Sequence, residues 1–140
     1  MHYFAKISKE DGVYLVSFPE LVNINTYGNT LSEAIENAEE ALNGSLESDF
    51  ERGFSLSEPK EHKGNGYYRI PVFPHLEIAY TLRKLRTGKS QVEIAHSLGI
   101  SYQAYQKLEN PRKCNPTIKT LEKIGIALGR KLEVSFSQLK

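Results

Sequence analysis

The sequence has little from which a disulfide-linked or membrane-bound protein could be built. Its 140 residues include one cysteine, Cys114, which excludes an internal disulfide. No apolar run approaches the roughly 18 residues of a membrane-spanning helix. The opening string MHYFAKISKEDG lacks the apolar region and cleavage site of a signal peptide, and internal repeats are also lacking. We therefore expect a soluble cytoplasmic protein, and the hydrophobic fraction of 39% and charged fraction of 25% argue against global disorder.

The net charge of +1 conceals a division between two halves of the chain. Residues 1–74 contain 6 Lys and Arg against 12 Asp and Glu, a formal charge of −6. Residues 75–140 contain 12 Lys and Arg against 5 Asp and Glu, a formal charge of +7. An acidic half suits a basic partner, and a basic half suits phosphate groups. Chance segregation of surface charges is the plainer alternative.

The first half carries the pattern of a small sheet. Asp11 and Gly12 form the kind of pair that favours a tight hairpin turn, with alternating strand-forming residues on both sides. Pro74 ends the region. Strands are predicted over residues 2–8, 13–18, 23–27 and 67–72.

One amphipathic helix is predicted between the third and fourth strands. Thr30 can cap its start, and Glu33 three residues later completes a capping box. An apolar stripe then continues to about Gly53, with glutamates off the stripe. Residues 55–66 are polar with proline and glycine, so they form a loop or linker. Residues 1–74 are therefore predicted to be an α+β domain, with one helix over the sheet.

From His75 the apolar period changes to 3.6, which predicts an all-α domain over residues 75–140. Ser90 and Glu93 form a second capping box, and glycines follow the apolar segments as stop signals. Helices are predicted from Leu76 to near Gly88, over 91–98, over 101–110, and from Thr117 to 128.

The tail KLEVSF, residues 131–136, alternates like a strand but has no obvious partner in its own domain. Pairing with its copy across a two-fold axis would satisfy its backbone donors and acceptors. We therefore expect a homodimer or higher even oligomer, with dimer contacts from Leu132, Val134 and Phe136. The alternative is that the tail packs back on its own subunit.

Residues 90–110 meet the requirements of a helix-turn-helix. Ala95 is small where two steeply crossing helices touch, and Gly99 permits the positive φ of the turn. The residues expected to fix both helices to the core are Ile94, Leu98, Ile100 and Leu108. The remaining face of the second helix carries long polar side chains that can reach base edges in a major groove. These candidate base-reading residues are Tyr102, Gln103, Gln106 and Lys107. An ordinary corner between two helices is the alternative.

The segment 75–130 resembles the helix-turn-helix of phage-repressor and Cro-like proteins, most clearly in the string YQAYQKLEN. The resemblance implies that Gln91, at the start of the first motif helix, holds a DNA phosphate. Arg112 and Lys113 in the following loop suit further phosphate contacts. Tyr105 departs from the pattern, because its position is usually Ile or Val. It must either bury its hydroxyl with a partner or widen the packing.

Residues 13–42 resemble the HicB antitoxin family. The resemblance is carried by a strand ending in FPEL, a short strand ending in TYG, and the string GNTLSEAIENAEEAL, in that order. It implies a reduced ribonuclease-H-like fold without catalytic carboxylates that binds HicA, a small basic toxin that cuts mRNA. It also implies a C-terminal domain that represses the toxin–antitoxin operon by binding double-stranded operator DNA. The surface glutamates that we expect to contact the toxin are Glu36, Glu39, Glu40 and Glu47.

Catalysis is not expected of either half. Ribonuclease-H chemistry needs several convergent carboxylates around two metal ions, whereas the predicted strands and turns offer only Glu10, Asp11 and Glu20. The four histidines have no metal-ligand spacing, so we expect no metal and no cofactor.

The sequence thus indicates an antitoxin of the HicB type that acts through two binding events. A stand-alone helix-turn-helix regulator whose first domain senses a small ligand is the main alternative, and a deep apolar pocket in that domain would favour it. A nuclease would need a metal site that the sequence does not contain.

Overall fold

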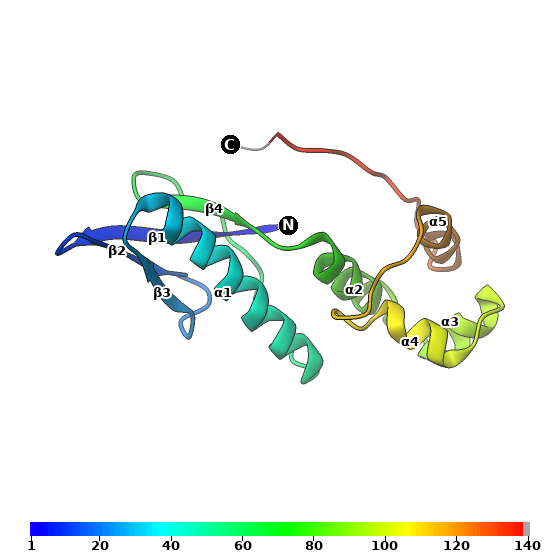
Figure 1. The fold of residues 1–140 in the computed structure, drawn as a ribbon. Coiled ribbons are helices and arrows are strands. Elements are labelled where there is room, and N and C mark those ends of the chain that lie inside the picture. Colours follow the sequence, from blue (N-terminus) through cyan, green and yellow to red (C-terminus); the bar gives the residue numbers. More distant parts are fainter. Residues whose placement is uncertain (139–140) are drawn as a thin grey trace. The chain divides into compact units, whose positions relative to one another are not determined.

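The computed structural model describes residues 1–138, which divide into two compact units, Met1–Glu77 and Ile78 onward (Figure 1). The predicted order, a sheet with one helix followed by a helical region, is confirmed. Among the described residues, no helix combines the length and apolar character that crossing a membrane requires.

The first unit is built on a four-stranded antiparallel sheet with the strand order β3-β2-β1-β4. Asp11 and Gly12 have positive φ values of 50° and 79°, as the predicted tight turn between β1 and β2 requires. The third strand begins two residues later than predicted and includes Gly28. The strands are β1 His2–Glu10, β2 Val13–Ser17, β3 Asn25–Gly28 and β4 Tyr67–Pro71.

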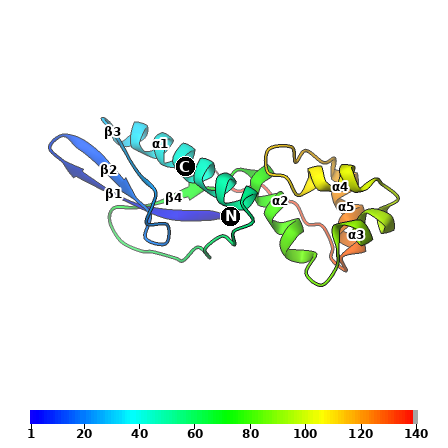
Figure 2. The same cartoon turned by 90° about the horizontal axis from the view of Figure 1, so that it is seen from below.

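Helix α1, Leu31–Glu51, packs along the sheet against β2, β3 and β4 (Figure 2). The Thr30 hydroxyl accepts a hydrogen bond from the Glu33 backbone N–H at 3.1 Å, so the predicted cap is confirmed. The helix approaches β3 very closely, because a Cβ on Gly28 would lie 2.3 Å from the backbone nitrogen of Ala34. Its buried apolar residues are Ala34, Ala38, Leu42, Leu46 and Phe50.

The polar segment over residues 55–66, predicted as a loop or linker, is a connection inside the first unit that leads from α1 to β4. Side chains fasten it to the strands and to the loop after β2. The Tyr3 hydroxyl donates a hydrogen bond to the carbonyl of Ser57, and His62 Nε2 lies 2.7 Å from Glu20 Oε1. The segment is therefore part of the first unit and not a linker between the two units.

We expect Gly28→Ala to destabilise the first unit by about 1–3 kcal/mol, the usual cost of forcing an extra carbon into a packed site. Urea unfolding followed by circular dichroism measures the change. Gly44→Ala is the matched control on α1, because a Cβ there meets nothing within 4 Å. Alanine is favoured over glycine in helices by up to about 1 kcal/mol, so the control is neutral or stabilising. Equal stability of Gly28→Ala and the parent chain would contradict the close approach.

In the second unit, apolar residues from four helices form one core. The core residues are Leu82, Ile94, Ala95, Tyr105, Leu108 and Ile124, with Leu98 packed against them. The expectation that Ile100 joins this core is wrong, since it is 36% exposed. It lies in the turn after the third helix, so no helix face directs it inward. The helices are α2 Pro74–Leu85, α3 Gln91–Leu98, α4 Tyr102–Leu108 and α5 Ile118–Ala127.

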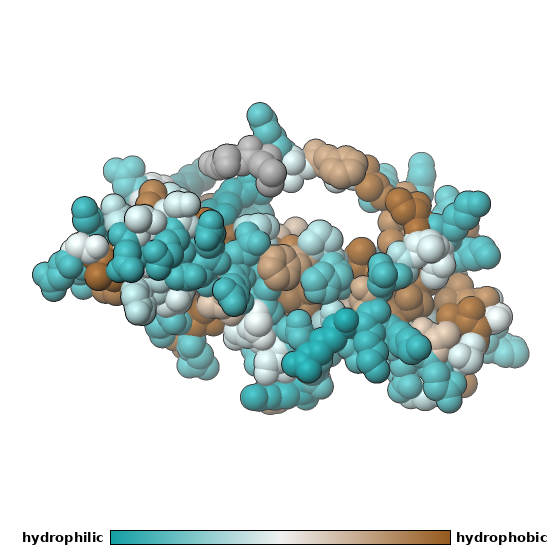
Figure 3. Space-filling model, in the orientation of Figure 1, coloured by the Kyte–Doolittle hydropathy of each residue, from teal (hydrophilic) through white to brown (hydrophobic). Residues whose placement is uncertain are grey.

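The tail over residues 131–138 is neither helix nor strand in the single chain. Leu132 is partly buried, but Val134 is 62% exposed and Phe136 is 99% exposed. The predicted strand over 131–136 is not formed within the subunit, because a strand needs a hydrogen-bonded neighbour and the described strands all belong to the sheet of the first unit. The tail's apolar side chains stand in brown in Figure 3. Pairing of two tails stays a prediction.

Candidate functional site: the helix-turn-helix surface

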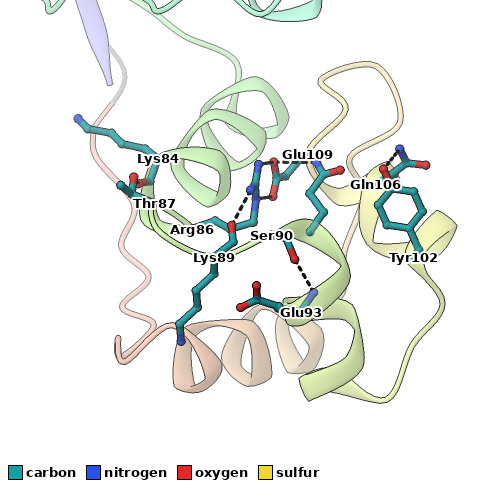
Figure 4. Close-up of polar contacts among 10 residues, drawn as sticks. Lys84, Arg86, Thr87, Lys89, Ser90, Glu93, Tyr102, Gln106 and Glu109 are labelled. Carbon is teal, nitrogen blue, oxygen red and sulfur yellow. Dashed lines mark hydrogen bonds and ion pairs between the residues drawn. The ribbon is translucent and has the colours of Figure 1, made fainter.

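The turn between α3 and α4 has the geometry that the sequence predicts. Ser90 Oγ accepts a hydrogen bond from the Glu93 backbone N–H at 3.0 Å and caps α3 (Figure 4). Gly99 has a φ of 68° and ends that helix in the left-handed conformation. Ser101 Oγ accepts from the Ala104 N–H at 3.0 Å and starts α4. Two short helices are thereby held at a tight corner over a buried Ala95.

Helix α4 separates an inner face from an outer face. Tyr105 and Leu108 point into the core of the second unit. The four candidate base-reading residues are all exposed, and they are Tyr102, Gln103, Gln106 and Lys107. Within this face, Gln106 Nε2 donates a hydrogen bond to the Tyr102 hydroxyl at 2.8 Å (Figure 4). The exposed face therefore offers amide, phenol and ammonium groups that can reach the edges of base pairs.

A buried ion pair joins the end of α2 to the end of α4. Arg86 Nε and a second guanidinium nitrogen donate to the two carboxylate oxygens of Glu109, at 2.6 Å and 3.0 Å. The Glu109 side chain is only 3% exposed, and the Arg86 side chain 20%. Hydrogen bonding to this carboxylate raises the pKa of Arg86 above its ordinary value, so the guanidinium stays charged. Neither partner of this pair is predictable from the sequence, because 23 residues separate them and no local pattern links them.

Gln91, the candidate phosphate contact, is tied to the same carboxylate. Its Nε2 donates to Glu109 Oε1 at 3.1 Å from the first position of α3. This bond uses one amide N–H and leaves the second N–H and the carbonyl oxygen for another partner. The amide is thus oriented by the protein, while its role toward a phosphate stays a prediction.

Tyr105, the departure from the phage-repressor pattern, is fully buried with 0% exposure. Its ring fills a place in the core, so the helix accommodates the larger side chain without expelling it. Its hydroxyl makes no hydrogen bond among the described residues, although it lies beside the Arg86–Glu109 pair. Burial, together with the Glu109 carboxylate, raises the pKa of Tyr105 well above its ordinary range and keeps it neutral.

The loop after α4 exposes the other two candidate phosphate contacts, Arg112 and Lys113. Asn110 shapes this loop, because its side-chain oxygen accepts from the Arg112 N–H at 2.9 Å and its carbonyl accepts from the Cys114 N–H at 2.8 Å. Cys114 itself is buried, and burial raises the pKa of its thiol. The loop therefore presents two cations while its only sulfur faces inward.

The candidate toxin contacts lie on α1 of the first unit. Glu36 and Glu40 are exposed, whereas Glu39 and Glu47 are half-buried. The sequence of this helix, LSEAIENAEEALNGSLESDFE, contains no lysine or arginine. Its outward surface is consequently acidic, and hydrophilic residues dominate the region of α1 in Figure 3. No group of three or more His, Cys, Asp or Glu suited to a metal ion occurs within residues 1–138.

Most of the second unit matches a known protein family. Residues 82–135 match the helix-turn-helix family, which covers α3, the turn, α4 and α5. The second unit is therefore a helix-turn-helix domain, of the kind that binds DNA.

The chain as a whole is similar to antitoxins named HicB. Antitoxin HicB 1 of Photorhabdus laumondii subsp. laumondii is 29% identical over 126 residues, which cover 90% of this chain and 80% of that protein. Antitoxin HicB 2 of the same organism is 27% identical over 134 residues, which cover 96% and 95%. The resemblance to HicB antitoxins noted in the sequence is confirmed.

Two crystal structures are also similar, both from Burkholderia pseudomallei. One is the N-terminal domain of its antitoxin HicB, with 25% identity and a TM-score of 0.47, covering 52% of this chain and 99% of that one. The other is the antitoxin HicB, with 19% identity and a TM-score of 0.46, covering 76% of this chain and 90% of that one.

We expect Glu109→Gln to destabilise the second unit by about 3 kcal/mol, because it leaves Arg86 next to a neutral amide. The value is at the low end for a broken buried pair, since the Arg86 side chain keeps 20% exposure. Thermal and urea unfolding measure it. Glu122→Gln, on the exposed surface of α5, is the matched control and should change stability by less than about 0.5 kcal/mol. A Glu109→Gln chain as stable as the control would show that the ion pair contributes nothing net.

Proposed function

We propose that the chain is an antitoxin that works by binding and carries out no catalysis. Its first unit neutralises a small basic ribonuclease of the HicA type, and its second unit represses the operon that encodes both proteins. Both events take place in the cytoplasm. The observation that carries the proposal is the similarity to HicB antitoxins over 90% of the chain, which includes a helix-turn-helix domain.

Operator reading by α4 is supported by the way its two faces differ. The inner face is fixed by Tyr105 and Leu108, so the exposed residues project from a helix whose rotation is set. Side chains held on a rigid element discriminate better than side chains on a loop. The formal charge of +7 over residues 75–140 supports attraction to the DNA backbone.

For DNA binding, Gln103→Ala or Lys107→Ala should relax base preference and cost about 1–3 kcal/mol of specific binding. Arg112→Ala or Lys113→Ala should instead weaken binding to all DNA sequences alike. Each should also make the slope of the logarithm of the binding constant against the logarithm of salt concentration shallower by about 1 for each phosphate that is no longer neutralised. Titrations of operator and of unrelated DNA at several salt concentrations separate the two effects. Unchanged operator binding by both α4 variants would exclude α4 as the reader.

Dimer formation through the tail is supported by its exposure. Val134 is 62% exposed and Phe136 is 99% exposed among residues 1–138. A pseudo-palindromic operator needs two recognition helices about one DNA turn, roughly 34 Å, apart. Two tails paired across a two-fold axis would bury these side chains and satisfy the tail backbone.

Deletion of residues 131–140 should therefore leave a monomer with a collapsed operator affinity, while toxin binding survives. Size-exclusion chromatography with light scattering measures the mass, and an operator titration runs in parallel. Val134→Ser with Phe136→Ser is the milder variant that keeps the chain length. A truncated chain that stays dimeric and binds operator normally would place the dimer contact elsewhere.

Toxin binding by the first unit is supported by charge. Residues 1–74 carry a formal charge of −6, and α1 has acidic side chains with no basic ones. Opposite charge on two surfaces raises the rate at which they meet more than it strengthens the final complex.

Glu36→Gln with Glu40→Gln should accordingly slow association with the toxin and make it less sensitive to salt, with a smaller change in dissociation. Surface plasmon resonance with a purified basic toxin of the HicA type gives both rates. Glu122→Gln in the second unit serves as the control for charge alone. If the full chain binds no co-encoded basic protein, the antitoxin proposal loses its main support.

The rival proposal, a regulator with a ligand-sensing first unit, gains little from the hollow beside the amino terminus. That hollow measures about 160 Å³ and is lined by Met1, His2, Pro59, Lys60 and Glu61. Pockets for small ligands usually measure about 300–1,000 Å³ and are mainly apolar. This hollow is smaller than that range.

A further inference from the structure

Tyr102 and Gln106 touch one another on the outer face of α4. They lie four positions apart, which places both on the same side of the helix. Gln106 Nε2 donates to the Tyr102 hydroxyl oxygen at 2.8 Å, and both residues are exposed (Figure 4). The bond joins two of the four candidate base-reading side chains, so the position of each depends on the other.

The bond decides what the Gln106 amide can still offer. A glutamine amide has two N–H donors and one carbonyl oxygen, which accepts. Because one N–H is given to Tyr102, the amide keeps one donor and one acceptor. A donor beside an acceptor matches adenine in the major groove, whose N7 accepts and whose N6 amino group donates. Guanine presents two acceptors there, O6 and N7, so a side chain that pairs with both must supply two donors.

The backbone that carries Tyr102 is held from two sides. Ser101 caps α4 immediately before it, and Tyr105 holds the same turn from the core side. The phenol oxygen accepts from Gln106, so its own O–H remains to donate to another acceptor. A glutamine without such a neighbour would rotate about its terminal bond and present either end.

We propose that Tyr102 is a positioning residue that holds the Gln106 amide as a donor–acceptor pair and thereby selects an adenine in the operator. The inference rests on the proposed function, since it takes α4 as the helix that enters the major groove. It names the base that one residue reads and the second residue on which that reading depends.

The experiment is a selection from a randomised double-stranded DNA library with the full chain, followed by titrations of the four single-base variants of the selected site. The proteins are the parent chain, Tyr102→Phe, Gln106→Ala and the double variant. Tyr27→Phe is the matched control, because it removes an exposed phenol oxygen from β3 of the first unit.

We expect the parent chain to require adenine at one position of each half-site, and Gln106→Ala to lower that preference by about 5- to 150-fold, the range for removing a bidentate base pairing. Tyr102→Phe should lower it by about three- to tenfold, the range of one neutral hydrogen bond. In the Gln106→Ala background, Tyr102→Phe should change the adenine preference no further. Preferences at the other positions of the site and the thermal midpoint report any purely structural effect, and Tyr27→Phe should move neither.

Two outcomes would overturn the inference while leaving the proposed function intact. One is a selected site in which Gln106→Ala relaxes a guanine position, since that requires both N–H groups to face the DNA. The other is a Tyr102→Phe chain that keeps the full adenine preference. A parent chain that selects no sequence at all would overturn the inference together with operator binding.

Discussion

Glu109 accepts hydrogen bonds from Arg86 at the end of α2 and from Gln91 at the start of α3, while it follows α4 directly in the chain. Three helices therefore meet at one carboxylate that is closed off from water. Removing two charges from water is costly, and the bidentate geometry and the additional amide bond offset that cost. The arrangement fixes how α3 and α4 stand relative to α2. The outer face of α4 depends on this arrangement, because its side chains can be aimed only as well as the helix is held.

Tyr105 also holds α4 in place, from the side that faces the core. Its ring is buried where an aliphatic residue would be usual, and its hydroxyl ends beside the Arg86–Glu109 pair without a hydrogen bond among residues 1–138. An unpaired buried hydroxyl normally lowers stability. The Tyr105 hydroxyl nevertheless lies beside a charged pair, which makes it less costly here than among aliphatic side chains.

Much of this fold is predictable, because its signals are local. The caps at Thr30, Ser90 and Ser101, and the turn glycine Gly99, act through atoms three or four residues away, so the sequence alone reveals them. The Arg86–Glu109 pair and the fastening of Ser57 by Tyr3 join residues 23 and 54 positions apart, and no local pattern reports such contacts. The prediction that Ile100 joins the core is wrong for a related reason. Its apolar character is evident from the sequence, but the direction in which the side chain of a turn residue points is not. The exposed face of α4 follows from helical spacing, whereas the Tyr102–Gln106 bond needs atomic positions.

The exposed tail has a consequence for the lifetime of the protein. Proteases bind their substrates as extended segments, and they cut first where a backbone is exposed and carries no regular hydrogen bonds. Residues 131–138 meet that description in the single chain, with Phe136 almost fully open to solvent. If two tails pair, both backbones are shielded at once. A subunit without its counterpart would then be degraded faster than one in an assembly. Because pairing depends on concentration, the lifetime of the protein would lengthen as its concentration rises.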